Sequence, residues 1–400
     1  MKIKSLVLAI SAVLCTTGAW ADNNVTTNTS GNYNTLTASQ QGGDGNSISI
    51  TQSTDNNQSS VSQNGSSNAA SVNQYSSYYW WYLPNNGGGL TNISQTGTSN
   101  TASINQDTTG WYYGNAYNTN SNASINQQGN ANAGTIGQYN QLFNNLASIN
   151  QYDFGNNASI LQYYGNGDNA GITQSGYYNS AAITQSSSVN GNTASISQYN
   201  PYSWVNGNTA SITQDAGYGN NASITQSGYG NQASIIQEGT YSTATINQQG
   251  NNNYASISQT ASNSQAGISQ VGDSNSVTIQ QANNASPQIT QSGSGNTITI
   301  NNQLWNNQNT QYITQTGLSD TANINQSGGT NNYASVTQSG NYDTANIVQG
   351  DQEADSITVS QTGDSNLATI NQDIYGPNGY NDIVNVTQSG YGNTATITQQ

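Results

Sequence analysis

Apolar and polar residues alternate along most of this chain, in a short unit that repeats. In residues 220–226, Asn, Ala, Ile and Gln occupy every second position, with Asn, Ser and Thr between them. A period of two places each set on its own face of a β-strand, and the following Ser-Gly-Tyr-Gly is typical of a turn. The next unit repeats the pattern, with Ile235 eleven residues after Ile224. Helical repeats need roughly 30 residues or more, so this unit predicts a β-solenoid.

The apolar column of the repeat is strictly kept. Every unit from Ile50 to Ile397 has Ile or Val at its centre, and Gln follows two residues later in all of them except at Asn302. Gly, Ser, Asn, Thr and Gln dominate the composition and only 5% of the residues are charged, which is also typical of a disordered low-complexity chain. Such a chain has no reason to keep one column of residues, so we expect an ordered repeat.

The spacing between units alternates. Gln63 and Gln74 are eleven residues apart, whereas Gln74 and Gln95 are 21 apart, and fixed and variable steps alternate in this way except between Gln198 and Gln214. The simplest explanation is two strands per coil, with tight turns along one edge and tolerant loops along the other. The predicted fold is all-β: a β-solenoid of stacked strand-turn-strand coils of about 22 residues, with two parallel, in-register sheets of the cross-β kind.

The face that carries Asn, Ala, Ile and Gln is expected to point into the core. Stacked Ile side chains supply apolar contact there. Each buried amide can hydrogen-bond to the same residue one coil above and below, which offsets the cost of burying it. In the central coils, this assembly ladder is expected to consist of Gln214, Gln226, Gln237, Gln248, Gln259, Asn220, Asn231, Ile224 and Ile235.

Asp replaces the inward Asn in several units near the C-terminus. With two strands per coil, Asp320 and Asp343 fall in one column of adjacent coils, and Asp355 and Asp382 fall in another. Stacked carboxylates oppose ionisation and weaken such a ladder at neutral pH. These four residues are candidate gatekeepers against premature assembly. The alternative is that their side chains lie at strand ends in solvent and have little effect.

Two of the variable loops are rich in aromatic residues. Tyr79, Trp80 and Trp81 lie in one loop, and Trp111 and Tyr112 lie in the next. The alternation of turns places both loops on the same edge of adjacent coils. Either these rings pack on each other and shield the solenoid, or this aromatic edge is a stacking platform for glycans or for a neighbouring fibre.

The charge of the chain is almost entirely negative. There are 17 Asp and Glu, no His, and two basic residues, Lys2 and Lys4, which gives a net charge of −15 at pH 7. Without cationic side chains, phosphates have no partner, which argues against nucleic acid and against an anionic membrane. No His, Lys, Arg or thiol accompanies the carboxylates, and no carboxylate pair lies in a break of the repeat. We therefore expect no enzyme, no catalytic residue, no cofactor and no metal site.

Three segments follow one another along the chain. Residues 1–21 have the parts of a secretory signal: a basic start with Lys2 and Lys4, a short apolar run, and an A-x-A cleavage site that ends at Ala21. Residues 22–40 are a polar leader, either flexible or a degenerate first unit, and residues 41–400 hold the repeats. The only cysteine, Cys15, lies in the signal segment, so the exported chain would have no thiol.

The repeat resembles that of a known family. Residues 226–237 read Gln-Ser-Gly-Tyr-Gly-Asn-Gln-Ala-Ser-Ile-Ile-Gln, and their pattern Gln-x-Gly-x-x-Asn-x-Ala-x-x-x-Gln is similar to the curlin repeat of curli fibre subunits. The resemblance implies an extracellular functional amyloid of a Gram-negative biofilm, in a fimbrium-like cell-surface fibre. It also implies export through an outer-membrane curli-type secretion pore, a nucleator subunit as partner, and a role in assembly for the inward Gln and Asn residues.

These observations predict a secreted structural subunit that polymerises head-to-tail into curli-like amyloid fibres for biofilm matrix, adhesion and surface colonisation, with matrix polysaccharide as a further partner. The repeat continues to residue 400 without a distinct cap, and open solenoid ends that meet head-to-tail form a filament. The alternative is a monomeric extracellular binding rod, either an adhesin or an ice-binding β-solenoid. Ice binding favours a regular Thr array, whereas the outward positions here mix Ser, Thr, Asn and Val.

Overall fold

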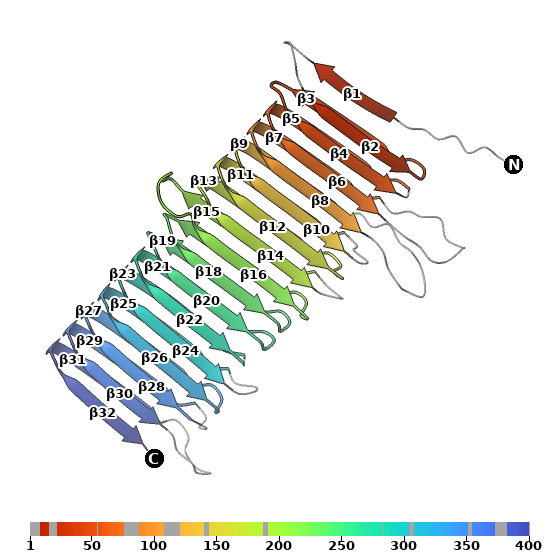
Figure 1. Ribbon diagram of the computed structural model, residues 1–400. Helices are drawn as coiled ribbons and strands as arrows, with labels where there is room; N and C mark the ends of the chain where they lie inside the picture. The colour runs from red at the N-terminus through yellow and green to blue at the C-terminus, as the bar shows by residue number, and fades with distance from the viewer. Residues whose placement is uncertain are drawn as a thin grey trace, which may run out of the picture. The chain divides into compact units, whose positions relative to one another are not determined.

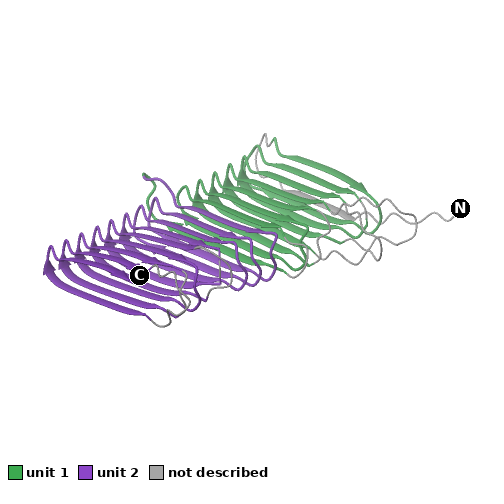
Figure 2. Cartoon of the chain, turned by 90° about the horizontal axis from the view of Figure 1, so that it is seen from below, with its two compact units in different colours: residues 1–204 green, residues 205–400 purple. Residues whose placement is uncertain are grey.

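The computed structural model describes residues 9–15, 22–53, 55–75, 88–107, 121–139, 144–186, 191–282, 284–303, 308–350, 354–372 and 382–399. The regular elements in these ranges are β-strands, numbered β1 to β32. The same ranges contain no helix that is long and apolar enough to cross a membrane. The chain divides into two compact units, residues 1–204 and residues 205–400, which are coloured separately in Figure 2.

In unit 1, successive strands alternate between two sheets (Figure 1). The odd sheet has the order β1-β3-β5-β7-β9-β11-β13-β15, and the even sheet has the order β2-β4-β6-β8-β10-β12-β14. The strands of unit 1 are β1 (Ala9–Cys15), β2 (Asn24–Ser30), β3 (Thr35–Gln41), β4 (Ser47–Ser53), β5 (Gln58–Ser66), β6 (Ala69–Tyr75), β7 (Leu90–Thr98), β8 (Thr101–Asp107), β9 (Asn122–Asn130), β10 (Ala133–Tyr139), β11 (Leu146–Phe154), β12 (Asn157–Tyr163), β13 (Asn169–Gly176), β14 (Ser180–Ser186) and β15 (Thr193–Asn200).

Unit 2 has the same construction. Its odd sheet runs from β17 to β31 and its even sheet from β16 to β32, again with alternate strands in alternate sheets. The strands of unit 2 are β16 (Thr209–Asp215), β17 (Asn221–Ser227), β18 (Gln232–Gln237), β19 (Thr243–Gln249), β20 (Tyr254–Gln259), β21 (Gln265–Asp273), β22 (Ser276–Gln281), β23 (Ser286–Ser294), β24 (Thr297–Gln303), β25 (Thr310–Leu318), β26 (Thr321–Ser327), β27 (Tyr333–Asn341), β28 (Thr344–Gln349), β29 (Ser356–Asp364), β30 (Leu367–Gln372), β31 (Ile383–Tyr391) and β32 (Thr394–Gln399).

Neighbouring strands in each sheet are parallel and in register with respect to the repeat. In the odd sheet of unit 2, Ile224 of β17 is the partner of Ile246 of β19. In its even sheet, Ile212 of β16 is the partner of Ile235 of β18. The predicted fold class, an all-β solenoid with two parallel in-register sheets and two strands per coil, is confirmed.

The alternation seen in the sequence becomes an alternation of burial. In β17 every second side chain, from Ala222 to Gln226, is buried, and those between them are half-buried or exposed. Ile224 and Ile235 are fully buried. The buried set of each strand therefore faces the opposite sheet, and the core is a thin layer between the two sheets.

From β3 onward, tight turns follow the odd strands except β15, and the variable connections follow the even strands, as the spacing predicts. The tight turn begins with a glycine at positive φ, for example Gly65 at 123° and Gly228 at 114°. These glycines stack so closely that a Cβ on Gly272 would lie 2.0 Å from the carbonyl oxygen of Gly293 in the next coil. Glycine is required there both by φ and by the approach of the neighbouring backbone.

The polar segment after residue 21 contains two strands of the solenoid. In β3 the inward residues Leu36, Ala38 and Gln40 are buried. In β2, every inward side chain is only half-buried. β2 pairs with β4 and β3 pairs with β5, both in parallel. Residues 24–30 and 35–41 therefore pair with the strands of the first clear repeats.

Candidate assembly site: the amide ladders of the core

The inward glutamines form two hydrogen-bonded ladders in unit 2, one in each sheet. In the odd sheet, Nε2 of Gln226 donates to Oε1 of Gln248 at 2.8 Å. In the even sheet, Gln214 donates to Gln237 at 2.9 Å, and Gln237 donates to Gln259 at 2.9 Å. All five are buried. The structure thus brings together the predicted glutamines in two columns, and Gln237, Gln248 and Gln259 are bonded to glutamines in the coils on both sides.

The second hydrogen of each Nε2 group reaches across the core. Gln226 donates to the carbonyl of Thr209 at 3.1 Å, and Gln237 donates to the carbonyl of Asn221 at 3.3 Å. These carbonyls belong to strands of the opposite sheet. Each glutamine therefore links neighbouring coils within one sheet and also ties the two sheets together, which satisfies polar groups that would be costly to bury alone.

The inward asparagines form a second kind of ladder at the start of the strands. The backbone N–H and Nδ2 of Asn231 both donate to Oδ1 of Asn208 in the preceding coil, each at 3.1 Å. Nδ2 of Asn231 also donates to the carbonyl of Gly250 at 2.7 Å, in a tight turn. Asn220 makes equivalent hydrogen bonds. Its Oδ1 accepts from the N–H of Ser242 at 2.9 Å, and its Nδ2 donates to the carbonyl of Gly239 at 2.7 Å. The ladder thereby fixes the turns as well as the strands.

The four candidate gatekeepers lie in these Asn columns, in the predicted pairs. The N–H of Asp343 donates to Oδ1 of Asp320, and the N–H of Asp382 donates to Oδ1 of Asp355. Asp320, Asp343 and Asp355 are almost completely buried, and Asp382 is half-buried. Oδ2 of each of the three buried residues has no hydrogen-bond partner in the described part of the chain. Three of these side chains are therefore in the core and not in solvent.

The buried carboxyl groups resist ionisation. Burial raises the pKa of Asp320 to about 6; the N–H of Asp343 partly offsets this effect, and the charges of Asp343 and Asp364 add to it. Burial likewise raises the pKa of Asp343 and of Asp355. Hydrogen bonds to both oxygens stabilise the charged form of a carboxyl group. The Oδ2 atoms of these three residues accept none from the described residues, which is consistent with the raised pKa.

The exception in the glutamine column, Asn302, has a structural partner that the sequence analysis missed. Gln311 occupies the small Ala position of β25, and its Nε2 donates to Oδ1 of Asn302 at 3.0 Å and also to Oε1 of Gln326. Asn302 and Gln311 are both buried. A shorter amide in one sheet thus faces a longer one in the other, and Gln311 connects the interrupted ladder to Gln326. The sequence does contain a signal for this contact, because Asn302 at a Gln position and Gln311 at an Ala position lie within ten residues of each other.

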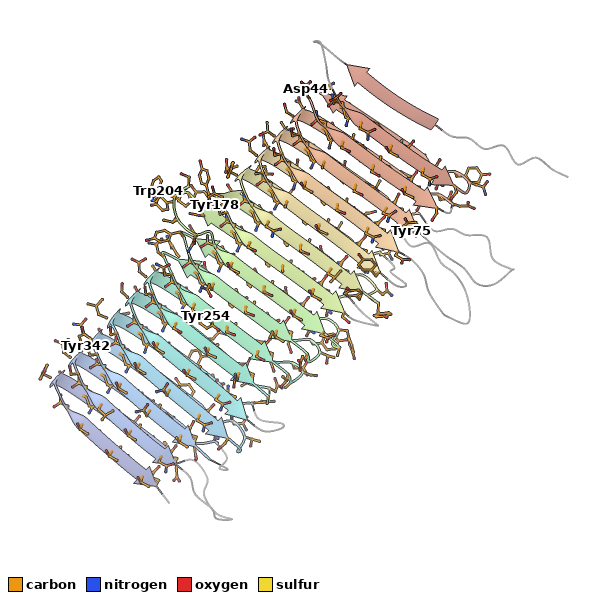
Figure 3. The ribbon with its side chains drawn as sticks, in the orientation of Figure 1. Asp44, Tyr75, Tyr178, Trp204, Tyr254 and Tyr342 are labelled. Atoms are coloured by element: carbon orange, nitrogen blue, oxygen red, sulfur yellow. The ribbon has the colours of Figure 1, made fainter. Side chains whose placement is uncertain are left out.

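The predicted aromatic edge, Tyr79, Trp80, Trp81, Trp111 and Tyr112, lies outside the described residues. Other aromatic side chains lie on the tight-turn edge of unit 1. Figure 3 labels Tyr178 and Trp204 there, and Tyr75 at the loop edge. Tyr178 makes an edge-to-face contact with Phe154, with ring centroids 5.5 Å apart, and Tyr202 lies 5.6 Å from Trp204. Trp204 is 79% exposed, so its ring is open to a ligand.

Fold and site define a class of protein: a parallel β-solenoid whose core is held by amide ladders. The family model described as the curlin associated repeat matches the chain at residues 43–75, 217–250, 250–282 and 329–373. The chain therefore contains curlin-type repeats at these four places, as its repeat pattern predicts. A search of curated proteins gave no match.

Proposed function

We propose that this protein is a secreted structural subunit that polymerises head-to-tail into extracellular, curli-like amyloid fibres. The observation that carries the proposal is the direction of the ladders. In unit 2, the hydrogen bonds between successive ladder glutamines all run in one direction, from Nε2 to Oε1 of the glutamine in the following coil, for example from Gln226 to Gln248 and from Gln248 to Gln270. A coil therefore offers donors on one side and acceptors on the other. Any two coils with this pattern are complementary, whether they belong to one molecule or to two.

The same geometry supports self-association over a monomeric role. A strand edge with unpaired N–H and C=O groups is a template for another strand. In this protein such an edge also presents an amide ladder and a column of isoleucines, which is the arrangement that stabilises cross-β fibrils. Contacts between different sides of the molecule do not close on themselves and so give a filament.

Further partners follow from the proposed role. Export would use a signal segment at residues 1–21 and an outer-membrane curli-type pore, and a nucleator subunit would start the fibre. The exposed ring of Trp204, beside Tyr202, suits stacking on a sugar ring of a neutral matrix polysaccharide. The fibre would thereby serve biofilm matrix, adhesion and surface colonisation, with no catalytic activity of its own.

The test is assembly of the purified chain from Asp22 onward. Thioflavin-T fluorescence is followed over time with electron microscopy, with and without fragmented fibres as seeds. We expect a lag, then fibres, a shorter lag with seeds, and a meridional reflection at about 4.8 Å from aligned fibres. A soluble monomer with strand signal and no dye binding would contradict the proposal and favour a monomeric adhesin or ice-binding solenoid.

A further inference from the structure

Two glutamines at the start of the ladders have an unused acceptor. Gln40 donates to Gln63 at 2.9 Å and Gln52 donates to Gln74 at 3.0 Å, so both ladders are made on the side of the later coils. On the other side, Oε1 of Gln40 and Oε1 of Gln52 are buried and have no hydrogen-bond partner among the described residues. A buried acceptor without a partner is destabilising, so both positions favour the arrival of a donor.

The strands that cover these two glutamines do not continue the ladder. β1 lies on the edge of β3, with Leu14 in register with Gln40. β2 lies on the edge of β4, with Thr27 in register with Ile50 and Thr29 in register with Gln52. The inward residues of β2 are only half-buried. β1 belongs to the predicted signal segment, so in a chain that begins at Asp22 β2 alone remains as a cover, and it is a poor match.

The glutamines of the last described strands lack a further glutamine to which they can donate. Gln388 of β31 accepts from Gln361 at 2.8 Å, and Gln399 of β32 accepts from Gln372 at 2.6 Å. Neither Gln388 nor Gln399 donates to a further glutamine in the part of the chain that the structure describes. The inward side chains of β32, which include Ile397, are half-buried, whereas those of interior strands are buried. Two glutamine donors thus stand on the last strands of unit 2, and two glutamine acceptors stand on the first strands of unit 1.

We propose that β31 and β32 of a second copy of this chain bind to β3 and β4, and that β32 displaces β2 from the edge of β4. The proposal rests on the proposed head-to-tail assembly and specifies its joint. Gln388 of one molecule donates to Gln40 of the next, and Gln399 donates to Gln52. Both orphaned acceptors are then used, and the two ladders continue through the joint.

Displacement follows from the order of strands along a solenoid. Strands alternate between the two sheets along the chain. When β31 of one molecule pairs with β3 of the next in the odd sheet, the even sheet has room for only one strand at the edge of β4. Both β32, which follows β31, and β2, which precedes β3, would occupy that position, so only one of them can bind there. β32 carries Ala395, Ile397 and Gln399 where β2 has Val, Thr and Thr at residues 25, 27 and 29. β32 therefore buries more apolar surface against Ile50 and supplies the missing donor.

The Asn column is preserved in the same exchange. In the single molecule, the N–H of Asn46 donates to Oδ1 of Asn23, directly before β2, at 2.9 Å. Asn393 stands directly before β32, where its own N–H donates to Asn366 at 3.2 Å. Asn393 thus takes the place of Asn23 without loss of a hydrogen bond. β2 serves as a provisional cover that slows assembly but does not extend the fibre.

The test locks β2 in place. Thr26 and Ser49 are register partners with exposed side chains, on parallel strands about 4.8 Å apart, which suits a disulfide. The variant Thr26→Cys with Ser49→Cys, in the chain from Asp22, has no other cysteine. As a matched control, Ser71→Cys with Ser103→Cys joins β6 to β8, both of which stay in place.

We expect the oxidised Thr26–Ser49 lock to abolish seeded growth and reduction to restore it, while the oxidised control grows like the unmodified chain. Growth of the oxidised lock at the control's rate overturns the strand exchange but leaves head-to-tail assembly intact. Absence of growth in the unmodified chain instead contradicts the proposed function itself.

A second variant pair reports the register at the joint. In the exchanged joint, Thr398 lies beside Thr51 of the next molecule, so fibres of Thr51→Cys with Thr398→Cys give covalent multimers on mild oxidation. If β2 stays on β4 and the new molecule stacks on β2, Thr398 lies beside Asn28, because Asn28 is the register partner of Thr51. Multimers from Asn28→Cys with Thr398→Cys, and none from the first variant, would overturn the proposal.

Discussion

The backbone N–H of Asp343 donates to Oδ1 of Asp320 at 3.0 Å, so two buried carboxyl groups lie one above the other. The asparagines of the same column use Nδ2 to reach a tight turn: Asn296 donates to the carbonyl of Gly317 at 3.2 Å, and Asn366 donates to that of Gly390 at 3.2 Å. Asp320 and Asp343 have oxygen in place of this donor. Only a protonated carboxyl group can donate there as an amide does.

The first prediction concerns the pH dependence of this column. Because burial raises the pKa of Asp320 from 3.8 to about 6, the folded chain holds this proton more tightly than the unfolded chain. The stabilising contribution is fully present below the ordinary pKa and is lost as the pH rises through about 6. We expect a higher thermal unfolding midpoint, and faster fibre growth, near pH 4.5 than near pH 7.5.

Substitution of all four gatekeepers, Asp320, Asp343, Asp355 and Asp382, by Asn removes the carboxyl groups from both columns, and at residues 320 and 343 it also supplies the donor that the neighbouring asparagines use. We expect this variant to be more stable than the unmodified chain near pH 7.5, to form fibres faster there, and to lose part of the pH dependence. Asp215→Asn, at an exposed position, is the control and should change neither quantity. If the fourfold variant keeps the full pH dependence, the gatekeeper role is wrong.

The second prediction concerns the ladder itself. Gln237→Leu removes the acceptor of Gln214 and the donor to Gln259 while it keeps the side chain's volume. Buried polar groups are then left unsatisfied on both sides, so we expect a loss of about 2–5 kcal/mol in the free energy of unfolding, measured by urea denaturation. The outward neighbour Ile236 is the control, and Ile236→Thr should cost about 0.5 kcal/mol or less. Equal effects of the two substitutions would mean that the ladder adds little to stability.

The third prediction concerns the glycine column of the tight turns. Gly272 has φ of 114°, and a Cβ there meets the carbonyl oxygen of Gly293 at 2.0 Å. Gly272→Ala should therefore destabilise unit 2 by more than about 3 kcal/mol, from backbone strain and from the clash together. Gly295 has φ of 68°, and its nearest neighbour would be Oγ of Ser319 at 3.3 Å, so Gly295→Ala should cost about 1 kcal/mol. Similar unfolding midpoints for the two variants would show that the column can shift to admit a side chain.

The fold was predictable because each strand repeats the same short-range pattern. The alternation of Ala222, Ile224 and Gln226 gave the buried face, and the alternating spacing gave two strands per coil and the edge of tight turns. The ladder residues followed from the same column. Strict repetition removes the usual difficulty of sequence-based reasoning, since each coil contacts only its neighbours and no long-range pairing has to be guessed.

Features that break the repeat could not be derived in this way. The direction of the ladder depends on how each amide is oriented, and residue identity does not show whether Gln226 donates forward or backward. The strands β2 and β3 were obscured because Thr29 stands where a Gln is expected in β2, and Ala38 stands where an Ile or Val is expected in β3. The contact between Asn302 and Gln311 crosses from one sheet to the other, and the pattern within a single strand carries no information about it.

The last prediction tests that contact with a double-mutant cycle. Asn302→Gln restores the regular column but adds a methylene group where Gln311 already fills the space, so it should overpack the core and destabilise it. Gln311→Ala restores the regular Ala position but leaves a gap beside Asn302 and removes its hydrogen bond, so it should also destabilise. Together they recreate the arrangement of the other coils. We expect the double variant to be more stable than either single variant, with a coupling of about 1–3 kcal/mol in urea denaturation. Additive losses would show that the two exceptions arose independently, each tolerated by its own surroundings.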